Sequence, residues 1–226
     1  MLVIIASPRD HAARALAARW VAQEVGVVTP ADLSQPGWCF DPIAPREGTA
    51  VIGGRRIPVR AIRGVITRLP AIFEADLPHI MPTDRGYVAA EMSAFLIAWL
   101  SALECPVVNR PVPPSLAGPN WRQAQWIHAA VRVGLQAPSA SPRSPDTINH
   151  AQTVTVLGGQ CIPLLAPFLA SYATRLAALA RVHLLSVRLV ALDTVVTFAG
   201  ADEWPDPSQP DVADALLSYL QSFRPC

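Results

Sequence analysis

Leu2-Val3-Ile4-Ile5-Ala6 is a continuous apolar run. Such a run is typical of a parallel strand that is buried on both faces. The residues from Arg9 to Glu24 predict a helix, and Val27 to Thr29 predicts a second strand. A strand, a helix and a strand in this order predict the opening of a parallel sheet that is covered by helices, which is an α/β fold.

The hydrophobic pattern predicts further alternating elements along the chain. They are a strand at Ala61–Thr67, a helix at Asp84–Leu103, a strand at Pro106–Asn109, a helix at Asn120–Val133, a strand at Thr153–Leu157, a helix at Leu165–Arg181, a strand at Val195–Ala199 and a helix at Val212–Phe223. Proline and small polar residues at Pro138–Pro145 predict an exposed turn or linker. We expect an α/β domain at residues 1–118 and an α+β region at residues 119–226.

Two segments of the sequence resemble each other. Ala50–Val59 and Thr155–Leu164 both contain an apolar strand, a Gly-Gly pair and a return strand. Both central positions of a type I′ turn need positive φ, which glycine adopts readily. We therefore expect two hairpins. A loop that cradles phosphate is the alternative, but neither glycine pair is followed by a helix start or a lysine.

The composition predicts a folded protein with a balanced charge. Of the 226 residues, 51% are hydrophobic and 15% are charged, which is the opposite of a disordered chain. With a net charge of +1, the chain lacks the positive potential that would attract nucleic acid or an anionic membrane. Every basic residue is an arginine, so a Walker A lysine, a Schiff-base lysine and a lysine general base are excluded.

No segment predicts export or a membrane span. The run Leu2–Ala6 is short and is followed at once by Pro8 and Arg9, unlike a signal peptide. Tyr87–Leu103 carries Glu91 and is better explained as a buried helix. The four cysteines are scattered without a C-x-x-C pair, which argues against a disulfide framework or a zinc site and fits a reducing cytoplasm.

Polar residues follow two of the predicted parallel strands. Arg68 comes directly after one strand, and Asn109 and Arg110 come at the end of the next. Open α/β sheets bind ligands at the carboxyl ends of their strands. Arginine binds carboxylate or phosphate through two nitrogens, and asparagine both donates and accepts, so these residues are candidates for ligand binding. The alternative is that they only solvate loops.

Glu91 is the only charged residue between Gly86 and Leu103. A buried carboxylate needs a partner, which Arg68 or Arg110 would supply. The pair would then be either structural or part of a substrate contact.

The helix predicted at Asn120–Val133 carries aromatic residues on two sides. One face holds Trp121, Ala124, His128 and Val131. Trp126 points nearly the opposite way, which predicts a helix between two layers. His128 is interpreted as a half-buried histidine, and Trp121 with Arg122 as a candidate binding pair.

Asp202 and Glu203 follow the strand predicted at Val195–Ala199. Carboxylates at the end of a strand are suitable ligands for Mg²⁺. The alternative is an acidic turn before the last helix.

The order of these features resembles the ATP-grasp ligases, in particular the RimK-type and microviridin-type peptide ligases. The resemblance covers most of the chain. It rests on Val28–Leu33, on Asp84–Leu100 leading into Val107–Pro111, on Trp121–Trp126 with Gly134–Pro138, and on Thr153–Gly159. It implies a pre-ATP-grasp domain with a parallel sheet, followed by a reduced ATP-grasp region.

The sequence also departs from this family. The ligases grip nucleotide phosphates with lysine or arginine, usually including a lysine of the nucleotide-binding lobe, and this chain has no lysine. Only Ser139–Gln152 stands where that lobe would be expected, and Val196–Glu203 replaces the family's terminal Glu-x-Asn metal motif. Phosphate grip and metal binding stabilise the charges of acyl-phosphate formation, so their loss argues against ligation by this chain alone.

The leading hypothesis is a shortened ATP-grasp-like accessory or substrate-binding subunit that needs no cofactor and binds a protein or peptide. Its expected binding residues are Arg68, Glu91, Asn109, Arg110, Trp121 and Arg122. The first alternative is a compact ligase that binds ATP through arginine and Mg²⁺ through Asp202 and Glu203. The second is a structural interaction module, and a homo-oligomer is left open.

Overall fold

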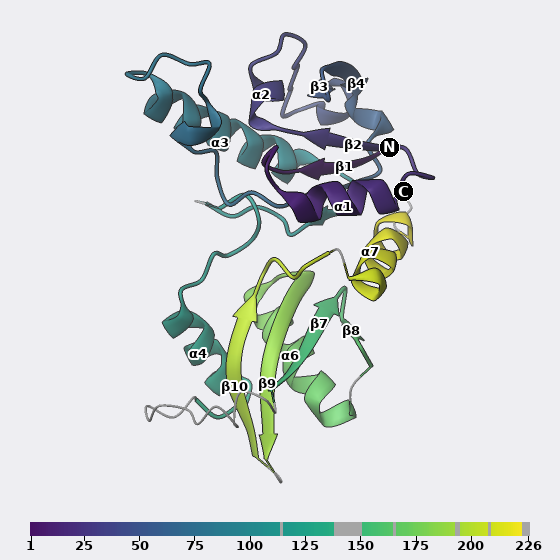
Figure 1. Ribbon diagram of the computed structural model, residues 1–226, viewed down its shortest axis with the longest axis vertical. Coiled ribbons are helices and arrows are strands. Elements are labelled where there is room, and N and C mark those ends of the chain that lie inside the picture. Colours follow the sequence, from purple (N-terminus) through teal and green to yellow (C-terminus); the bar gives the residue numbers. More distant parts are fainter. Residues whose placement is uncertain (114, 138–150, 165, 193–194, 208, 223–226) are drawn as a thin grey trace. The chain divides into compact units, whose positions relative to one another are not determined.

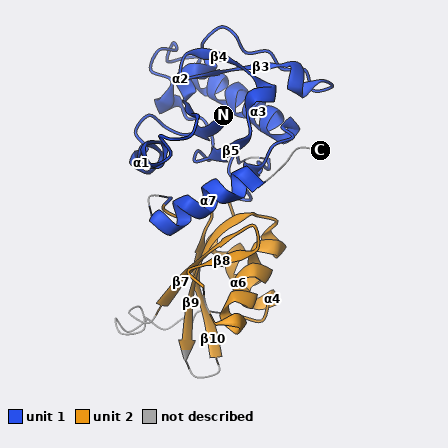
Figure 2. Cartoon of the chain, turned by 90° about the vertical axis from the view of Figure 1, so that its right-hand side faces the viewer, with its two compact units in different colours: residues 1–119, 207–226 blue, residues 120–206 orange. Residues whose placement is uncertain are grey.

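The computed structural model describes residues 1–113, 115–137, 151–164, 166–192, 195–207 and 209–222 (Figure 1). The chain forms two compact units, residues 1–119 with 207–226 and residues 120–206 (Figure 2). The sequence analysis placed residues 207–226 in the second region, whereas the contacts group them with the first unit. The domain boundary after residue 118 stays a prediction. The linker predicted at Pro138–Pro145 lies outside the described residues.

The first unit is built around a parallel sheet, as the opening of the sequence predicts. Its elements are β1 (Leu2–Ile5), α1 (His11–Arg19), β2 (Val25–Val28), α2 (Pro30–Leu33), β3 (Thr49–Ile52), β4 (Arg55–Pro58), β5 (Gly64–Thr67), α3 (Arg85–Ala102), β6 (Val107–Val108) and α7 (Pro210–Ser222), with 3-10 turns at Pro45–Glu47, Val59–Ala61 and Glu74–Asp76. The strand order is β2-β1-β5-β6, and every pairing in this sheet is parallel. The predicted α/β class is confirmed.

Helix α1 is shorter than the sequence predicts. Asp10 caps its amino end, because its Oδ1 accepts a hydrogen bond of 3.0 Å from the Ala13 N–H. The helix ends at Arg19, and tight turn hydrogen bonds from Val21 and Gln23 then lead the chain into β2.

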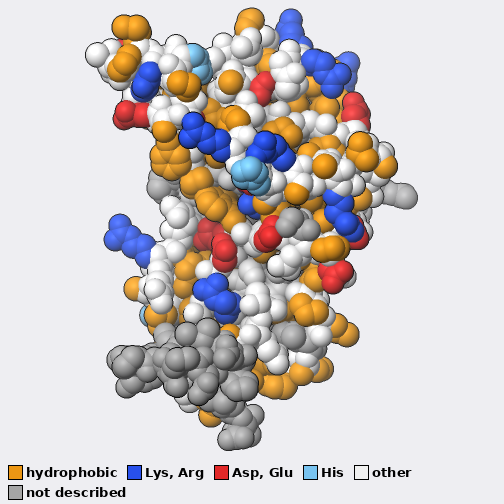
Figure 3. All heavy atoms as spheres, viewed as in Figure 1, with side chains coloured by type: hydrophobic (Ala, Val, Ile, Leu, Met, Phe, Trp, Pro, Cys, Tyr) orange, Lys and Arg blue, Asp and Glu red, His pale blue; other side chains and the backbone are white. Residues whose placement is uncertain are grey.

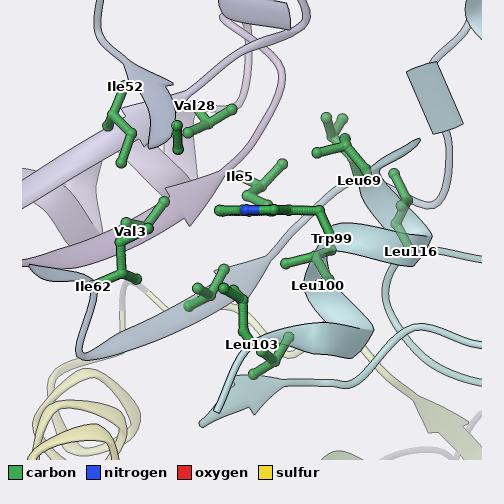
Figure 4. Packing of buried hydrophobic residues seen from close by; sticks show 14 of the residues in the cluster. Val3, Ile5, Val28, Ile52, Ile62, Leu69, Trp99, Leu100, Leu103 and Leu116 are labelled. Carbon is green, nitrogen blue, oxygen red and sulfur yellow. The ribbon is translucent and has the colours of Figure 1, made fainter. Parts of the chain in front are cut away.

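Helix α3 supplies the centre of the first core. The Trp99 side chain is 1% exposed and lies beside Ile5 of β1 (Figure 4). Its ring also meets Trp38 edge to face, with centroids 5.4 Å apart. Although α3 is strongly apolar, no helix among the described residues is long and apolar enough to cross a membrane.

Helix α7 packs in the first unit. The Trp20 Nε1–H donates to the Ala213 carbonyl at 3.3 Å, and Arg19 pairs with Asp214 at 2.7 Å. Leu220 approaches Gly64 so closely that a Cβ there would lie 2.9 Å from it. These contacts explain why residues distant in sequence share this unit.

Both predicted hairpins are present. Strands β3 and β4 pair around Gly53 and Gly54, whose φ angles are 56° and 73°. Strands β7 and β8 pair around Gly158 and Gly159, with φ angles of 56° and 89°. The positive φ at both central positions is what a type I′ turn requires, so the hairpin interpretation is confirmed.

The second unit consists of an antiparallel sheet and two helices. Its elements are α4 (Gln123–Arg132), β7 (Ala151–Leu157), β8 (Gln160–Ile162), α6 (Pro167–Ala180), β9 (Leu184–Leu192) and β10 (Val195–Asp202). The strand order is β10-β9-β7-β8, and α4 and α6 lie on the same face of the sheet (Figure 2). Strand β9, which the sequence analysis did not predict, pairs with both β7 and β10.

Helix α4 buries one face, where the sequence predicts a helix covered on two. Its buried residues are Trp126, Ala129 and Ala130. His128 and Val131 are exposed, so the half-buried histidine is a wrong prediction. The helix begins only at Gln123; Trp121 therefore lies before it and packs against Trp126, with ring centroids 4.8 Å apart.

We expect Trp99→Ala to lower the free energy of unfolding of the first unit by about 3–5 kcal/mol, because it leaves a large cavity beside β1. Tyr87→Ala is the matched control, since Tyr87 lies on the same helix and is 71% exposed. It should change stability by no more than about 0.5 kcal/mol. Urea unfolding followed by circular dichroism measures both, and equal effects would contradict this description of the core.

Candidate functional site

An ion pair lies at the carboxyl edge of the parallel sheet. The strand order reverses between β1 and β5, because the chain first adds β2 on one side of β1 and then β5 on the other. Ligands of open α/β sheets bind outside the carboxyl ends of strands at such a reversal. Arg68, just after β5, donates from Nε to the Asp10 Oδ2 at 2.7 Å, and both side chains are about 85% buried.

The electrostatics of Asp10 reflect this position. Burial alone would raise the pKa of Asp10, but the hydrogen bond from Arg68 and the backbone N–H of Ala13 hold the pKa below its ordinary value. Asp10 therefore stays ionised at neutral pH. It both caps α1 and orients the Arg68 guanidinium.

Two further polar residues are buried at this edge. Thr67 ends β5 and is 2% exposed, and among the described residues its Oγ1 has no hydrogen-bond partner. Asn109 follows β6 and is 3% exposed. Polar side chains buried at the ends of adjacent strands are the kind of groups that fix a ligand's orientation.

Two predicted binding residues have other surroundings. The Arg110 guanidinium donates to the carbonyls of Leu100, Ser101, Leu103 and Cys105 at 3.0–3.4 Å, so it caps the end of α3. Glu91 is exposed on α3, and Arg68 pairs with Asp10 instead. The expectation of a buried Glu91 paired with an arginine is therefore wrong.

In the second unit, Glu203 holds the segment that leads into α4. Its carboxylate accepts hydrogen bonds from the N–H groups of Asn120 at 3.1 Å and Trp121 at 3.4 Å. Burial raises the pKa of Glu203, and the two N–H donors offset this only in part. Asp202 accepts from the Trp204 N–H at 2.8 Å.

These contacts bear on the Mg²⁺ ligation predicted for Asp202 and Glu203. Both carboxylates use oxygen atoms to bind backbone N–H groups, as in an acidic turn. Among the described residues, no group of three or more His, Cys, Asp or Glu side chains is placed to hold a metal. Mg²⁺ is commonly held by one or two carboxylates together with waters and phosphate oxygens, so to bind it Asp202 and Glu203 would have to be joined by such ligands.

Trp121 lies beside two cavities of the second unit. A cavity of about 420 Å³ is lined by Trp121, His128, Arg132 and Leu179, among others. A second, of about 230 Å³, is lined by Trp121, Trp126 and Arg188. Arg122 is exposed at the start of α4. The surface around Trp121 therefore combines aromatic walls with nearby cationic groups.

The structure thus divides the predicted site residues between the two units. Arg68 and Asn109 both lie at the carboxyl edge of the parallel sheet, and Trp121 meets Glu203 in the second unit. Asp10 was missed by the sequence analysis, whereas Thr67 lies at the end of the strand predicted at Ala61–Thr67. An available signal for Asp10 was its place before a helix, where aspartate is a preferred cap.

Comparison with known proteins shows the fold. No protein-family model and no curated protein matches the sequence. The ATP-grasp ligase PsnB complexed with minimal precursor is similar with a TM-score of 0.69 and 12% identity, over 98% of this chain and 97% of that one. The macrocyclase MdnC of Microcystis aeruginosa MRC, bound with precursor peptide MdnA, has a TM-score of 0.64 and 10% identity, over 96% and 99%.

A RimK domain protein ATP-grasp from Sphaerobacter thermophilus DSM 20745 is more distant, with a TM-score of 0.51 and 12% identity over 98% of this chain and 100% of that one. The chain therefore has the fold of the ATP-grasp ligases, including two whose structures contain a precursor peptide. This confirms the resemblance found in the sequence and the predicted fold class. At these identities the likeness concerns the fold alone.

We expect Asp10→Asn to destabilise the first unit by about 1.5–3 kcal/mol at pH 7, because it removes a charged hydrogen bond to a buried arginine while keeping the helix cap. Since the folded-state pKa of Asp10 is lowered, the pair stabilises the protein above about pH 4, and this contribution is lost as the pH falls through the folded pKa. The two proteins should therefore converge in acid. Asp214→Asn removes the acid of an exposed ion pair and is the control, so it should change the free energy of unfolding little. If the stability of wild type and of Asp10→Asn varied with pH in the same way, the role given to the Asp10–Arg68 pair would be contradicted.

Glu203→Gln should destabilise the second unit less than Glu203→Ala does at pH 7. The N–H groups of Asn120 and Trp121 bind different carboxylate oxygens, so the amide oxygen keeps only one of them as a donor. The raised pKa of Glu203 means that its charged form costs stability as the pH rises through that pKa, and the neutral amide avoids this cost. Glu203→Ala should lose about 1 kcal/mol, because the two donors lose their acceptor. Thermal unfolding at pH 4 and pH 7 measures these effects, and greater loss in Glu203→Gln than in Glu203→Ala would exclude this role.

Proposed function

We propose that the chain is an accessory protein of ATP-grasp fold that binds a peptide or protein partner and has no ligase activity of its own. The main support for this proposal is that Asp202 and Glu203 accept hydrogen bonds from backbone N–H groups. Carboxylate activation needs charge stabilisation at the phosphates and the metal. This chain also has no lysine that would stabilise the charge of the phosphates.

A peptide partner is supported by the similar structures. PsnB is complexed with its minimal precursor and MdnC with the precursor peptide MdnA. We assign the contact surface in this chain to Trp121, which lines both cavities of the second unit, and to the exposed Arg122 that follows it in the sequence. Half-buried tryptophan is a frequent anchor in peptide and protein interfaces.

The carboxyl edge of the parallel sheet is a second part of the proposed surface. Arg68 and Asn109 are buried there, and the Asp10 carboxylate holds the Arg68 guanidinium in place. A fixed guanidinium favours a planar anion such as a peptide carboxylate. Basic and acidic side chains are interspersed on the face seen in Figure 3, which supports a mixed polar partner rather than a polyanion.

A compact ligase is the second candidate function. One PsnB structure is complexed with a precursor variant, Mg and ADP, which favours nucleotide use by this fold. In this candidate, arginine replaces the phosphate-binding lysine, and Asp202 and Glu203 rearrange to bind Mg²⁺. An interaction module that forms homo-oligomers is the remaining alternative.

The test uses the full chain and fluorescently labelled precursor-type peptides, with the precursor peptide MdnA as the first probe. We expect saturable binding by fluorescence anisotropy, about tenfold weaker for Trp121→Ala, because an anchor of this kind contributes more than about 1.4 kcal/mol. Tyr87→Ala, at an exposed aromatic of the first unit, is the matched control and should bind as the wild type does.

The same mixtures are assayed for ADP release with ATP and Mg²⁺. We expect none above the rate without protein. If the wild type released ADP and the double variant Asp202→Asn with Glu203→Gln did not, the compact ligase would replace the proposed accessory role. Absence of peptide binding together with a concentration-dependent dimer in light scattering would favour the interaction module.

A further inference from the structure

A cavity of about 320 Å³ opens at the amino edge of the parallel sheet. Leu2 of β1, Arg63 directly before β5 and Pro106 directly before β6 all line it. The three strands are parallel neighbours, so these positions share one edge, at the opposite ends of the strands from Arg68 and Asn109. The cavity is therefore separate from the candidate site and does not depend on the proposed function.

The floor of this cavity is apolar. Leu2, Ile62, Leu103 and Leu220 line it, and each is at most 6% exposed. Its volume lies within the range of small-ligand sites. An apolar group that entered the cavity would therefore be removed from water on most of its surface.

The rim of the cavity is positively charged. It carries Arg46, Arg60 and Arg63 against a single acid, Glu104. Arg46 pairs with Glu104 at 3.2 Å, and both side chains are about half exposed. Within the described part of the chain, Arg60 and Arg63 are exposed and form no ion pair, so the rim has unbalanced positive charge.

Cys105 also lines the cavity. Burial raises the pKa of its thiol to about 11, so the side chain is neutral at physiological pH. It therefore adds no negative charge that would oppose an anion.

We propose that this cavity binds a small anionic amphiphile, an apolar group that ends in a carboxylate. The apolar group lies on the floor formed by Leu103 and Leu220, and the carboxylate meets the guanidinium groups of Arg60 and Arg63. Guanidinium binds carboxylate through two parallel hydrogen bonds. Two molecules share this chemistry: a free medium-chain carboxylic acid, and the carboxyl-terminal apolar residue of a peptide.

Calorimetric titration of the full chain with octanoate and with Gly-Gly-Leu distinguishes the two sources, since the tighter ligand identifies the class. We expect saturable binding of one of them and at least tenfold weaker binding of 1-octanol, which lacks the charge. Arg60→Gln with Arg63→Gln should weaken the carboxylate by about tenfold or more. Arg55→Gln with Arg56→Gln removes the same charge from the exposed hairpin strand β4 and should leave the affinity unchanged.

A second variant tests the cavity itself rather than its charge. Gln221 is exposed on α7 and lines the cavity, so Gln221→Trp places a large ring at its mouth with little risk to the fold. It should weaken binding of the carboxylate and of 1-octanol alike. The proposal is overturned by an absence of saturable binding up to millimolar ligand, by equal weakening in the two arginine pairs, or by unchanged binding to Gln221→Trp.

Discussion

Burial of β1 is the constraint on which the first unit depends. Every residue of Leu2–Ile5 is at most 1% exposed, and the strand pairs with β2 on one side and β5 on the other. Its backbone groups can only be satisfied by those neighbours, so the sheet order and the reversal between β1 and β5 follow from it. Asp10 follows its carboxyl end and Leu2 lies at its amino end, so one strand positions both the Asp10–Arg68 pair and the apolar floor of the opposite cavity.

In the second unit, a carboxylate has the corresponding structural role. Glu203 binds the N–H groups of Asn120 and Trp121 and so connects the end of β10 to the segment before α4. The oxygen atoms that would serve Mg²⁺ in a ligase here satisfy the backbone. Trp121 lines both cavities of this unit. The fold of the peptide ligases is thus present, while Asp202 and Glu203 bind backbone N–H groups.

Local patterns in the sequence predicted the elements whose positions they mark directly. The β1 run, the α3 helix and both Gly-Gly hairpins follow from burial, periodicity and positive φ. Glu91 could not be placed in this way, because α3 is apolar on most sides and its periodicity does not define which side faces water. Strand β9 depends on pairing with β7 and β10, and Arg110 depends on the carbonyls at the end of α3; both interactions form only when distant segments meet. The prediction that α4 lies between two layers was wrong because Trp121, which indicated the second apolar face, precedes the helix.

Calorimetric titration of the purified chain with ATP, with and without Mg²⁺, tests most directly whether this fold has lost its nucleotide chemistry. We expect no Mg²⁺-dependent heat, because Asp202 and Glu203 bind backbone N–H groups and the chain has no lysine. Micromolar, Mg²⁺-dependent binding of ATP would contradict this. It would mean that arginine grips the phosphates and that the two carboxylates leave their backbone partners to hold the metal.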